Sequence, residues 1–112
     1  SGLLIAPMDM TVVMNNLLDN AIEACQKVPP EGRSIYVQLI LKDVLFLSVR
    51  NSSLPVTIVE NTIATTKTPA QLHGFGLQNV KTILEKYQAF FTMRYENGYF
   101  SFAAELPNMP AS

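Results

Sequence analysis

The sequence predicts an α/β two-layer sandwich in which helices cover one face of a mixed, mostly antiparallel sheet. Three observations lead to this prediction. Residues 34–41 and 44–50 alternate apolar side chains with the two-residue period of a strand. The run Glu96-Asn97-Gly98, between two further strand-like segments, is a strong β-hairpin signal. The third is a set of apolar residues spaced with the 3.6-residue period of an amphipathic helix: Leu77, Val80, Ile83, Leu84 and Tyr87.

The N-terminal half predicts a short strand, a long helix and a hairpin. Residues 3–6 form the possible first strand, which Pro7 closes. Asp9 is the predicted N-cap of a helix that runs to about Lys27, and residues 29–32 end it in a loop. The strands at 34–41 and 44–50 then pair antiparallel through a tight reversal at Lys42-Asp43.

The C-terminal half predicts an irregular segment, a second helix and a second hairpin. Residues 51–55 read as a turn, and residues 57–63 as a short helix that packs through Val59 and Ile63. Residues 64–72 form a polar loop of a length that is usually functional or mobile. The second helix follows Gly76, the last two strands cover 89–95 and 99–106, and the tail from Pro107 is expected to fray.

Composition limits the class of protein. With 112 residues and 48% apolar content, residues 1–112 form one domain with a real core. No apolar run approaches the roughly 20 residues of a membrane span. The single cysteine, Cys25, lies on the apolar side of the first helix and is expected to be a small buried hydrophobe in a reducing, cytoplasmic setting. A net charge of −1 with eight scattered basic residues leaves no basic patch for nucleic acid.

The first helix carries an unusual polar stripe. Asn16 and Asn20 stand at positions i and i+4, so their amides project side by side, next to Glu23 and Lys27. Asparagine is a mediocre helix former, about 0.5–0.7 kcal/mol worse than alanine. A pair of asparagines therefore indicates either a ligand-binding face or an ordinary solvated face, and this helix alone does not separate the two.

A second candidate is Gly74-Phe75-Gly76, which leads directly into a helix. It is not a G-x-G-x-x-G fingerprint, because Asn79 stands at the third glycine position. Two glycines before a helix still allow close approach of a phosphate to free N–H groups at the positive end of the helix dipole. A simple tight turn is the other interpretation. The sequence lacks a P-loop, a nucleophile elbow and a Cys/His cluster suited to zinc.

The combination of these features resembles the Bergerat-fold ATPase family, which joins DNA gyrase, heat-shock chaperones, sensor histidine kinases and mismatch-repair ATPases. Residues 16–24, Asn-Leu-Leu-Asp-Asn-Ala-Ile-Glu-Ala, resemble the family's N box. Residues 73–77, His-Gly-Phe-Gly-Leu, resemble its second glycine box, and Thr65-Thr66-Lys67 resembles a lid element of sensor kinases. The resemblance spans nearly the whole chain and is closest to the quorum-sensing-receptor branch of histidine kinases.

The resemblance implies a Mg-ATP site. By this resemblance, the side-chain oxygen of Asn20 would coordinate Mg²⁺. Asn16 would hydrogen-bond a phosphate or a metal-bound water. The resemblance assigns Lys67, on the lid, to the terminal phosphate, so that Asn16 and Lys67 would be the catalytic residues. His73 would orient the lid or touch phosphate. The phosphates themselves would be held by the backbone amides of Gly74, Gly76 and Leu77.

The chain departs from the family at the first glycine box, normally D-x-G-x-G. Asn51-Ser52-Ser53 stands there instead. An asparagine amide can accept from the adenine amino group and donate to the adjacent ring nitrogen, so Asn51 remains the implied adenine contact. A neutral amide makes a weaker bond than a carboxylate does.

The implied function is transfer of the γ-phosphoryl group of ATP to a histidine on a separate dimerisation domain in two-component signalling. The chain would be the cytoplasmic ATP-binding domain of a membrane-anchored, homodimeric receptor kinase, and a response regulator would be its indirect partner. Two alternatives stay open: a serine protein kinase of the anti-sigma-factor type on the same fold, and a scaffold that no longer binds nucleotide.

Overall fold

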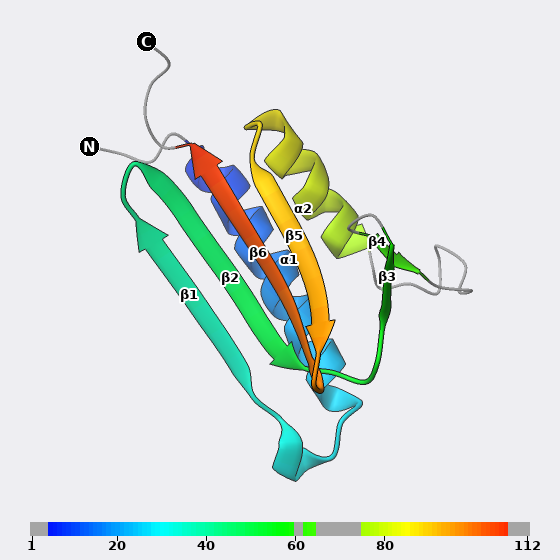
Figure 1. Cartoon of the computed structure of the whole chain (residues 1–112). Helices are drawn as coiled ribbons and strands as arrows, with labels where there is room; N and C mark the ends of the chain where they lie inside the picture. Colours follow the sequence, from blue (N-terminus) through cyan, green and yellow to red (C-terminus); the bar gives the residue numbers. More distant parts are fainter. Residues whose placement is uncertain (1–4, 60–61, 65–74, 108–112) are drawn as a thin grey trace.

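Two helices lie on one face of a four-stranded sheet in the computed structural model, which describes residues 5–59, 62–64 and 75–107 (Figure 1). The helices are α1 (Pro7–Gln26) and α2 (Phe75–Lys86), and a short 3-10 turn covers Pro30–Gly32. The strands are β1 (Ile35–Leu41), β2 (Val44–Ser52), β3 (Thr57–Val59), β4 (Thr62–Ala64), β5 (Phe90–Glu96) and β6 (Tyr99–Pro107). This is the predicted two-layer sandwich.

The main sheet has the strand order β1-β2-β6-β5, and every pairing among the described strands is antiparallel. Hairpins and a central β2–β6 pairing account for all neighbours among the described strands, so this part of the sheet is antiparallel. Asn97 and Gly98 form the β5–β6 turn with φ of 53° and 86°. Positive φ at both central residues matches the twist of a hairpin, as the Asn-Gly pair predicted.

The core lies between the helices and the inward face of β2 and β6. Alternation brings Leu45, Leu47 and Val49 of β2 to this face, and all three are buried. Helix α1 meets them with one stripe, as its 3.6-residue period requires. The other buried members are Ile5, which precedes α1, then Val13, Leu17, Ala21 and Cys25 of α1, Val80 and Leu84 of α2, Met93 of β5, and Phe100, Phe102, Ala104 and Leu106 of β6.

Helix α1 begins earlier than predicted. Pro7, expected to close a strand, stands in the first turn of the helix, and Ala6 is the N-cap. Proline fits there because its missing N–H would have no partner and its φ is already helical. Asp9 is consequently inside the first turn and is not the N-cap. Ile5 and Ala6 are not in a strand, and the rest of the predicted first strand lies outside the described residues.

The segment after β2 also differs from the prediction. Strand β2 continues through Asn51 and Ser52, expected to form a turn, because they pair with Phe100 and Tyr99 of β6. The predicted helix at 57–63 is instead the small β3–β4 ribbon, in which Ile58 pairs with Ile63. The polar loop from 65 and the tail beyond Pro107 lie outside the described residues; Pro107 itself pairs with Val44. No helix in the described part of the chain is long and apolar enough to span a membrane.

Candidate functional site

The polar stripe of α1 faces the start of α2. Asn16 is half-buried, and its Nδ2 donates to the backbone carbonyl of Val12, one turn earlier, at 2.8 Å. This bond fixes the amide plane and leaves Oδ1 as the atom that faces α2. Asn20, one turn further along the same stripe, is also half-buried, and no described residue hydrogen-bonds its side chain. Glu23 is exposed, as predicted.

Gly76 lies directly against Asn16. A Cβ built on Gly76 would come within 3.0 Å of Asn16 Oδ1, and within 3.5 and 3.6 Å of its Cβ and Cγ. The backbone of Gly76 is not in the left-handed region, so close contact with Asn16, and not its torsion angles, is what favours glycine here. The contact unites two sequence features that were identified separately, the asparagine stripe and the glycine before the helix.

The N-terminus of α2 therefore opens beside the asparagine stripe. The helix starts at Phe75, so its first backbone N–H groups have no partner within the helix. Those groups and the positive end of the helix dipole make this end attractive to an anion. The Leu77 side chain packs against the core, so only its backbone is suited to such a ligand. Gly74, His73 and Lys67 lie outside the described residues.

Asn51 is buried at the end of β2, with 1% of its surface exposed. It continues the inward-facing row of Leu45, Leu47 and Val49, on the face that the helices cover. Its Nδ2 donates to the Ser52 carbonyl at 3.0 Å, and no described residue donates to its Oδ1. An amide oxygen accepts hydrogen bonds, so Oδ1 is the Asn51 atom with which a ligand could pair.

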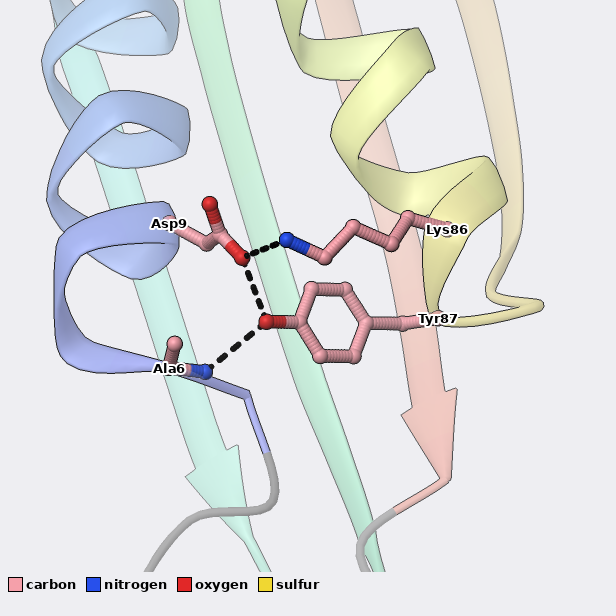
Figure 2. Close-up of polar contacts among 4 residues, drawn as sticks. All are labelled: Ala6, Asp9, Lys86 and Tyr87. Atoms are coloured by element: carbon pink, nitrogen blue, oxygen red, sulfur yellow. Dashed lines mark hydrogen bonds and ion pairs between the residues drawn. The ribbon is translucent and has the colours of Figure 1, made fainter.

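A polar cluster at the other end of the helix pair holds α2 against α1 (Figure 2). Lys86 Nζ lies 2.7 Å from Asp9 Oδ2, and the Tyr87 hydroxyl donates to the same oxygen. The Tyr87 oxygen in turn accepts from the Ala6 N–H at 2.9 Å. The hydrogen bonds from Lys86 and Tyr87 lower the pKa of Asp9, and the carboxylate raises the pKa of Lys86. With the Asn16–Gly76 contact, this cluster fixes the second helix at two points.

Sequence reasoning missed this cluster, because Asp9 is far from Lys86 and Tyr87 along the chain. It also missed a cluster under the end of β2. Ser52 Oγ donates to the Gly32 carbonyl at 2.7 Å and accepts from the Ser34 N–H at 2.9 Å. These bonds hold Ser52, and hence the neighbouring Asn51, in the sheet. The sequence signal that could have placed Asn51 and Ser52 in the strand was the two-residue alternation of β2, extended by two residues.

The structure brings Asn16 and Gly76 together, with Asn20 one turn away and Leu77 next to Gly76. Asn51 lies on the same inward side of the sheet, at the end of β2. In the described part of the chain there is no cluster of three or more His, Cys, Asp or Glu side chains around a potential metal position.

Comparison with known proteins gives a family and a fold. The family model of the GHKL domain matches residues 5–107. Among curated protein sequences, none matches the chain significantly.

Several solved structures share the fold. The catalytic domain of histidine kinase ThkA, in a nucleotide-free form, is 27% identical with a TM-score of 0.67; the match covers 90% of this chain and 67% of that one. The mycobacterial sensor histidine kinase MprB has a TM-score of 0.69 at 17% identity, over 97% of this chain and 78% of that one. Histidine kinase AdeS of Acinetobacter baumannii has a TM-score of 0.60 at 17% identity, and the match covers 90% of this chain and 46% of that one. The last two similarities concern the fold alone.

Proposed function

The chain belongs to the GHKL domain family, and from this premise we propose that it binds Mg-ATP between α1 and α2 and supplies the γ-phosphoryl group to a histidine on a separate domain. The observation that carries the proposal is the contact between Gly76 and Asn16 Oδ1. A side chain at residue 76 would fill the space between the asparagine stripe and the first turn of α2. A glycine lets the first turn of α2 approach the asparagine stripe closely.

The donor atoms fit a phosphate-bound Mg²⁺. The ion prefers oxygen ligands, keeps several waters, and is held by few protein groups together with substrate phosphates. Asn20 would offer its neutral amide oxygen as a ligand of the ion, and Asn16 Oδ1 would accept a hydrogen bond from a metal-bound water. When bound, the ion neutralises charge on the phosphates.

The first turn of α2 would hold the phosphates through its backbone amides, with Gly74, Gly76 and Leu77 as the donors. Lys67 and His73 are proposed to complete the phosphate contacts from the lid. Phosphoryl transfer needs little covalent chemistry from the protein, so positioning and electrostatic stabilisation are what this domain contributes. The nucleophile would come from the dimerisation domain.

Asn51 is the proposed adenine contact. Its Nδ2 is bonded to the Ser52 carbonyl, so the atom available to a base is Oδ1, an acceptor for the exocyclic amino group of adenine. Guanine presents a carbonyl at that position, and two acceptors would then face each other. We therefore expect ATP to bind in preference to GTP.

Titration calorimetry with Mg-ATP tests the proposal on the wild type, Asn20→Ala and the control Asn15→Ala, which changes an exposed residue next to the stripe. We expect Asn20→Ala to weaken Mg-ATP binding at least about tenfold, or 1.4 kcal/mol, and Asn15→Ala to leave it unchanged. Binding of nucleotide without Mg²⁺ should respond less to Asn20→Ala, because the lost group is a metal ligand.

Absence of binding at millimolar nucleotide would overturn the proposal and favour a scaffold without nucleotide. If wild type and Asn20→Ala bind Mg-ATP with equal affinity, only the assignment of Asn20 as a metal ligand is rejected. Phosphotransfer is checked by adding a purified phosphoacceptor domain of a quorum-sensing kinase with radiolabelled ATP. Acid-labile label on that domain is expected for a histidine kinase, and acid-stable label on serine would support the anti-sigma-factor alternative.

A further inference from the structure

The main sheet has an open face on the side away from the helices. Helices α1 and α2 both lie behind the sheet in Figure 1, and no described element covers its front. An antiparallel sheet in a two-layer fold usually turns polar side chains to water. This face also exposes large apolar side chains, among them Val44 of β2 and Phe90 of β5, which are 41% and 71% exposed.

The register of β2, β6 and β5 arranges the side chains of the open face in rows that run across the sheet. Even-numbered residues of β2 and β5 and odd-numbered residues of β6 point outward, because their chain neighbours are the ones that pack on the core. Three successive rows are the phenylalanine row (Phe46, Glu105, Phe90), the small row (Ser48, Ala103, Thr92) and the basic row (Arg50, Ser101, Arg94).

The phenylalanine row contains an acid without an ion-pair partner among the described residues. Glu105 is exposed and stands between Phe46 and Phe90. The row borders a shallow depression lined by Phe46, Phe90, Thr92, Ala103, Ala104 and Glu105. A cation placed there would meet a carboxylate and aromatic rings, both of which attract it.

The basic row has the opposite charge. Arg50 Cζ lies 4.2 Å from the centroid of the Tyr99 ring and 5.4 Å from that of the Tyr36 ring, so the guanidinium is held against the face by two aromatic side chains. No described carboxylate forms an ion pair with Arg50. Arg94 lies 3.6 Å from Glu96 in an exposed pair, which contributes little and is easily exchanged for another partner. The row therefore offers guanidinium groups to an external carboxylate.

A second copy of this chain is complementary to the open face. Consider a twofold axis that lies between two facing sheets, runs across the strands and passes over the small row. Each strand then lies over its own copy in the reverse direction, so the phenylalanine row of one copy faces the basic row of the other. The facing pairs are Phe46 with Arg50, Phe90 with Arg94, and Glu105 with Ser101, which places Glu105 between the two arginines. Each pair occurs twice, as in any isologous interface.

This arrangement brings unlike groups together. Aromatic rings meet guanidinium groups, and Glu105 can accept hydrogen bonds from Arg50 of the second copy. The small row on the axis allows the sheets to reach the spacing of about 10 Å at which sheets pack face to face. An axis along β6 would instead lay basic row on basic row and place Arg50 opposite Arg94 of the second copy, a contact between like charges.

We propose that the open sheet face is a homodimer interface in which the phenylalanine row of each copy packs on the basic row of the other. Strand spacing and rise make a four-stranded face about 19 Å wide and about 30 Å long. Two such faces cover roughly 1,100 Å², close to the lower limit for a specific interface, so the association is expected to be weak and reversible. The proposal does not depend on nucleotide binding.

Sedimentation velocity up to millimolar concentration tests the contact. The wild type is expected to associate reversibly. Arg50→Glu and Glu105→Arg should each weaken association at least about tenfold, because each substitution creates two like-charge contacts across the twofold axis. The control Glu85→Arg makes the same charge change at an exposed position of α2, in the helix layer, and should leave association unchanged. Thermal melts of all variants check folding.

Mixing the variants tests the register. A trace of Arg50→Glu, fluorescently labelled at its N-terminus, is sedimented with an excess of unlabelled Glu105→Arg. Residues 50 and 105 then have opposite charges at both contacts, so association of the labelled chain should recover at least about tenfold over its own self-association. An excess of Glu85→Arg has the same net charge but leaves one like-charge contact, so recovery should be much smaller. A wild type that stays monomeric at millimolar concentration overturns the proposal, as do single variants that associate like the wild type or equal recovery in the two mixtures.

Discussion

Gly76→Ala tests the contact on which the proposed nucleotide site is based. The new Cβ would lie 3.0 Å from Asn16 Oδ1 and 3.5 Å from Asn16 Cβ, the first of which is closer than ordinary contact. The asparagine amide cannot move away freely, because its Nδ2 is bonded to the Val12 carbonyl at 2.8 Å. Relief of the crowding therefore lengthens that bond or shifts the first turn of α2.

The expected effect on stability follows from two opposing terms. Alanine is favoured over glycine in a helix by up to about 1 kcal/mol. Strain on the Asn16–Val12 bond, whose net worth is about 0.5–1.5 kcal/mol, opposes this gain. We expect the free energy of unfolding to change by less than about 1 kcal/mol in the wild type. In an Asn16→Ala background the crowding is gone, so Gly76→Ala should stabilise by about 0.5–1 kcal/mol.

The assay is a double-mutant cycle by urea denaturation, followed by calorimetry with Mg-ATP. A coupling energy of about 1 kcal/mol between the two substitutions is expected. Gly76→Ala alone should weaken Mg-ATP binding at least about tenfold, because it displaces Asn16 Oδ1 or the first turn of α2. The same stability change in both backgrounds, together with unaltered Mg-ATP affinity, would refute the argument.

Three further predictions follow from the described contacts. Leu47→Ala should lower the free energy of unfolding by about 2–5 kcal/mol, as urea denaturation will measure. Leu39→Ala changes the exposed cross-strand partner of Leu47 and should lower the same free energy by less than about 1 kcal/mol. The lowered pKa of Asp9 means that its bond to Lys86 stabilises the fold above the ordinary aspartate pKa of about 3.9 and is lost as pH falls through the lower folded value. Asp9→Asn should therefore flatten the decline of the urea midpoint below about pH 4, and an unchanged decline would contradict the assignment. Asn51→Asp should destabilise the ligand-free chain by about 1–3 kcal/mol at neutral pH, since a carboxylate cannot donate to the neighbouring carbonyl, while tightening ATP binding in calorimetry.

Most elements of the fold were predictable, because each rests on a local period or turn. Strands β1 and β2 follow from the alternation of Val37 to Val49, and the β5–β6 turn from Asn97-Gly98, whose positive φ angles few other residue pairs tolerate. The family resemblance, based on the N box and the second glycine box, was also confirmed. These signals are short-range, so a single sequence contains them.

The errors arose where tertiary pairing decided the local structure. Residues 57–63 have no strong period, and the pairing of Ile58 with Ile63 makes them a ribbon instead of a helix. Asn51 and Ser52 have turn-forming side chains, yet pairing with β6 keeps them in a strand. The predicted capping role of Asp9 failed because Pro7 begins the helix first and Lys86 engages the carboxylate.

The sequence alone determined the two helices, the main strands and their apolar faces, since backbone geometry imposes periods of 3.6 and 2 residues on any segment that buries one side. It also marked Asn16, Asn20 and Gly76 as unusual, and the family resemblance implied one nucleotide site for all three. Only the tertiary structure decided that Gly76 packs on Asn16 and that Asn51 is buried at the end of β2, with its Nδ2 bonded to the Ser52 carbonyl. These features depend on contacts between segments far apart in the chain, and such contacts are fixed by the packing of the whole core.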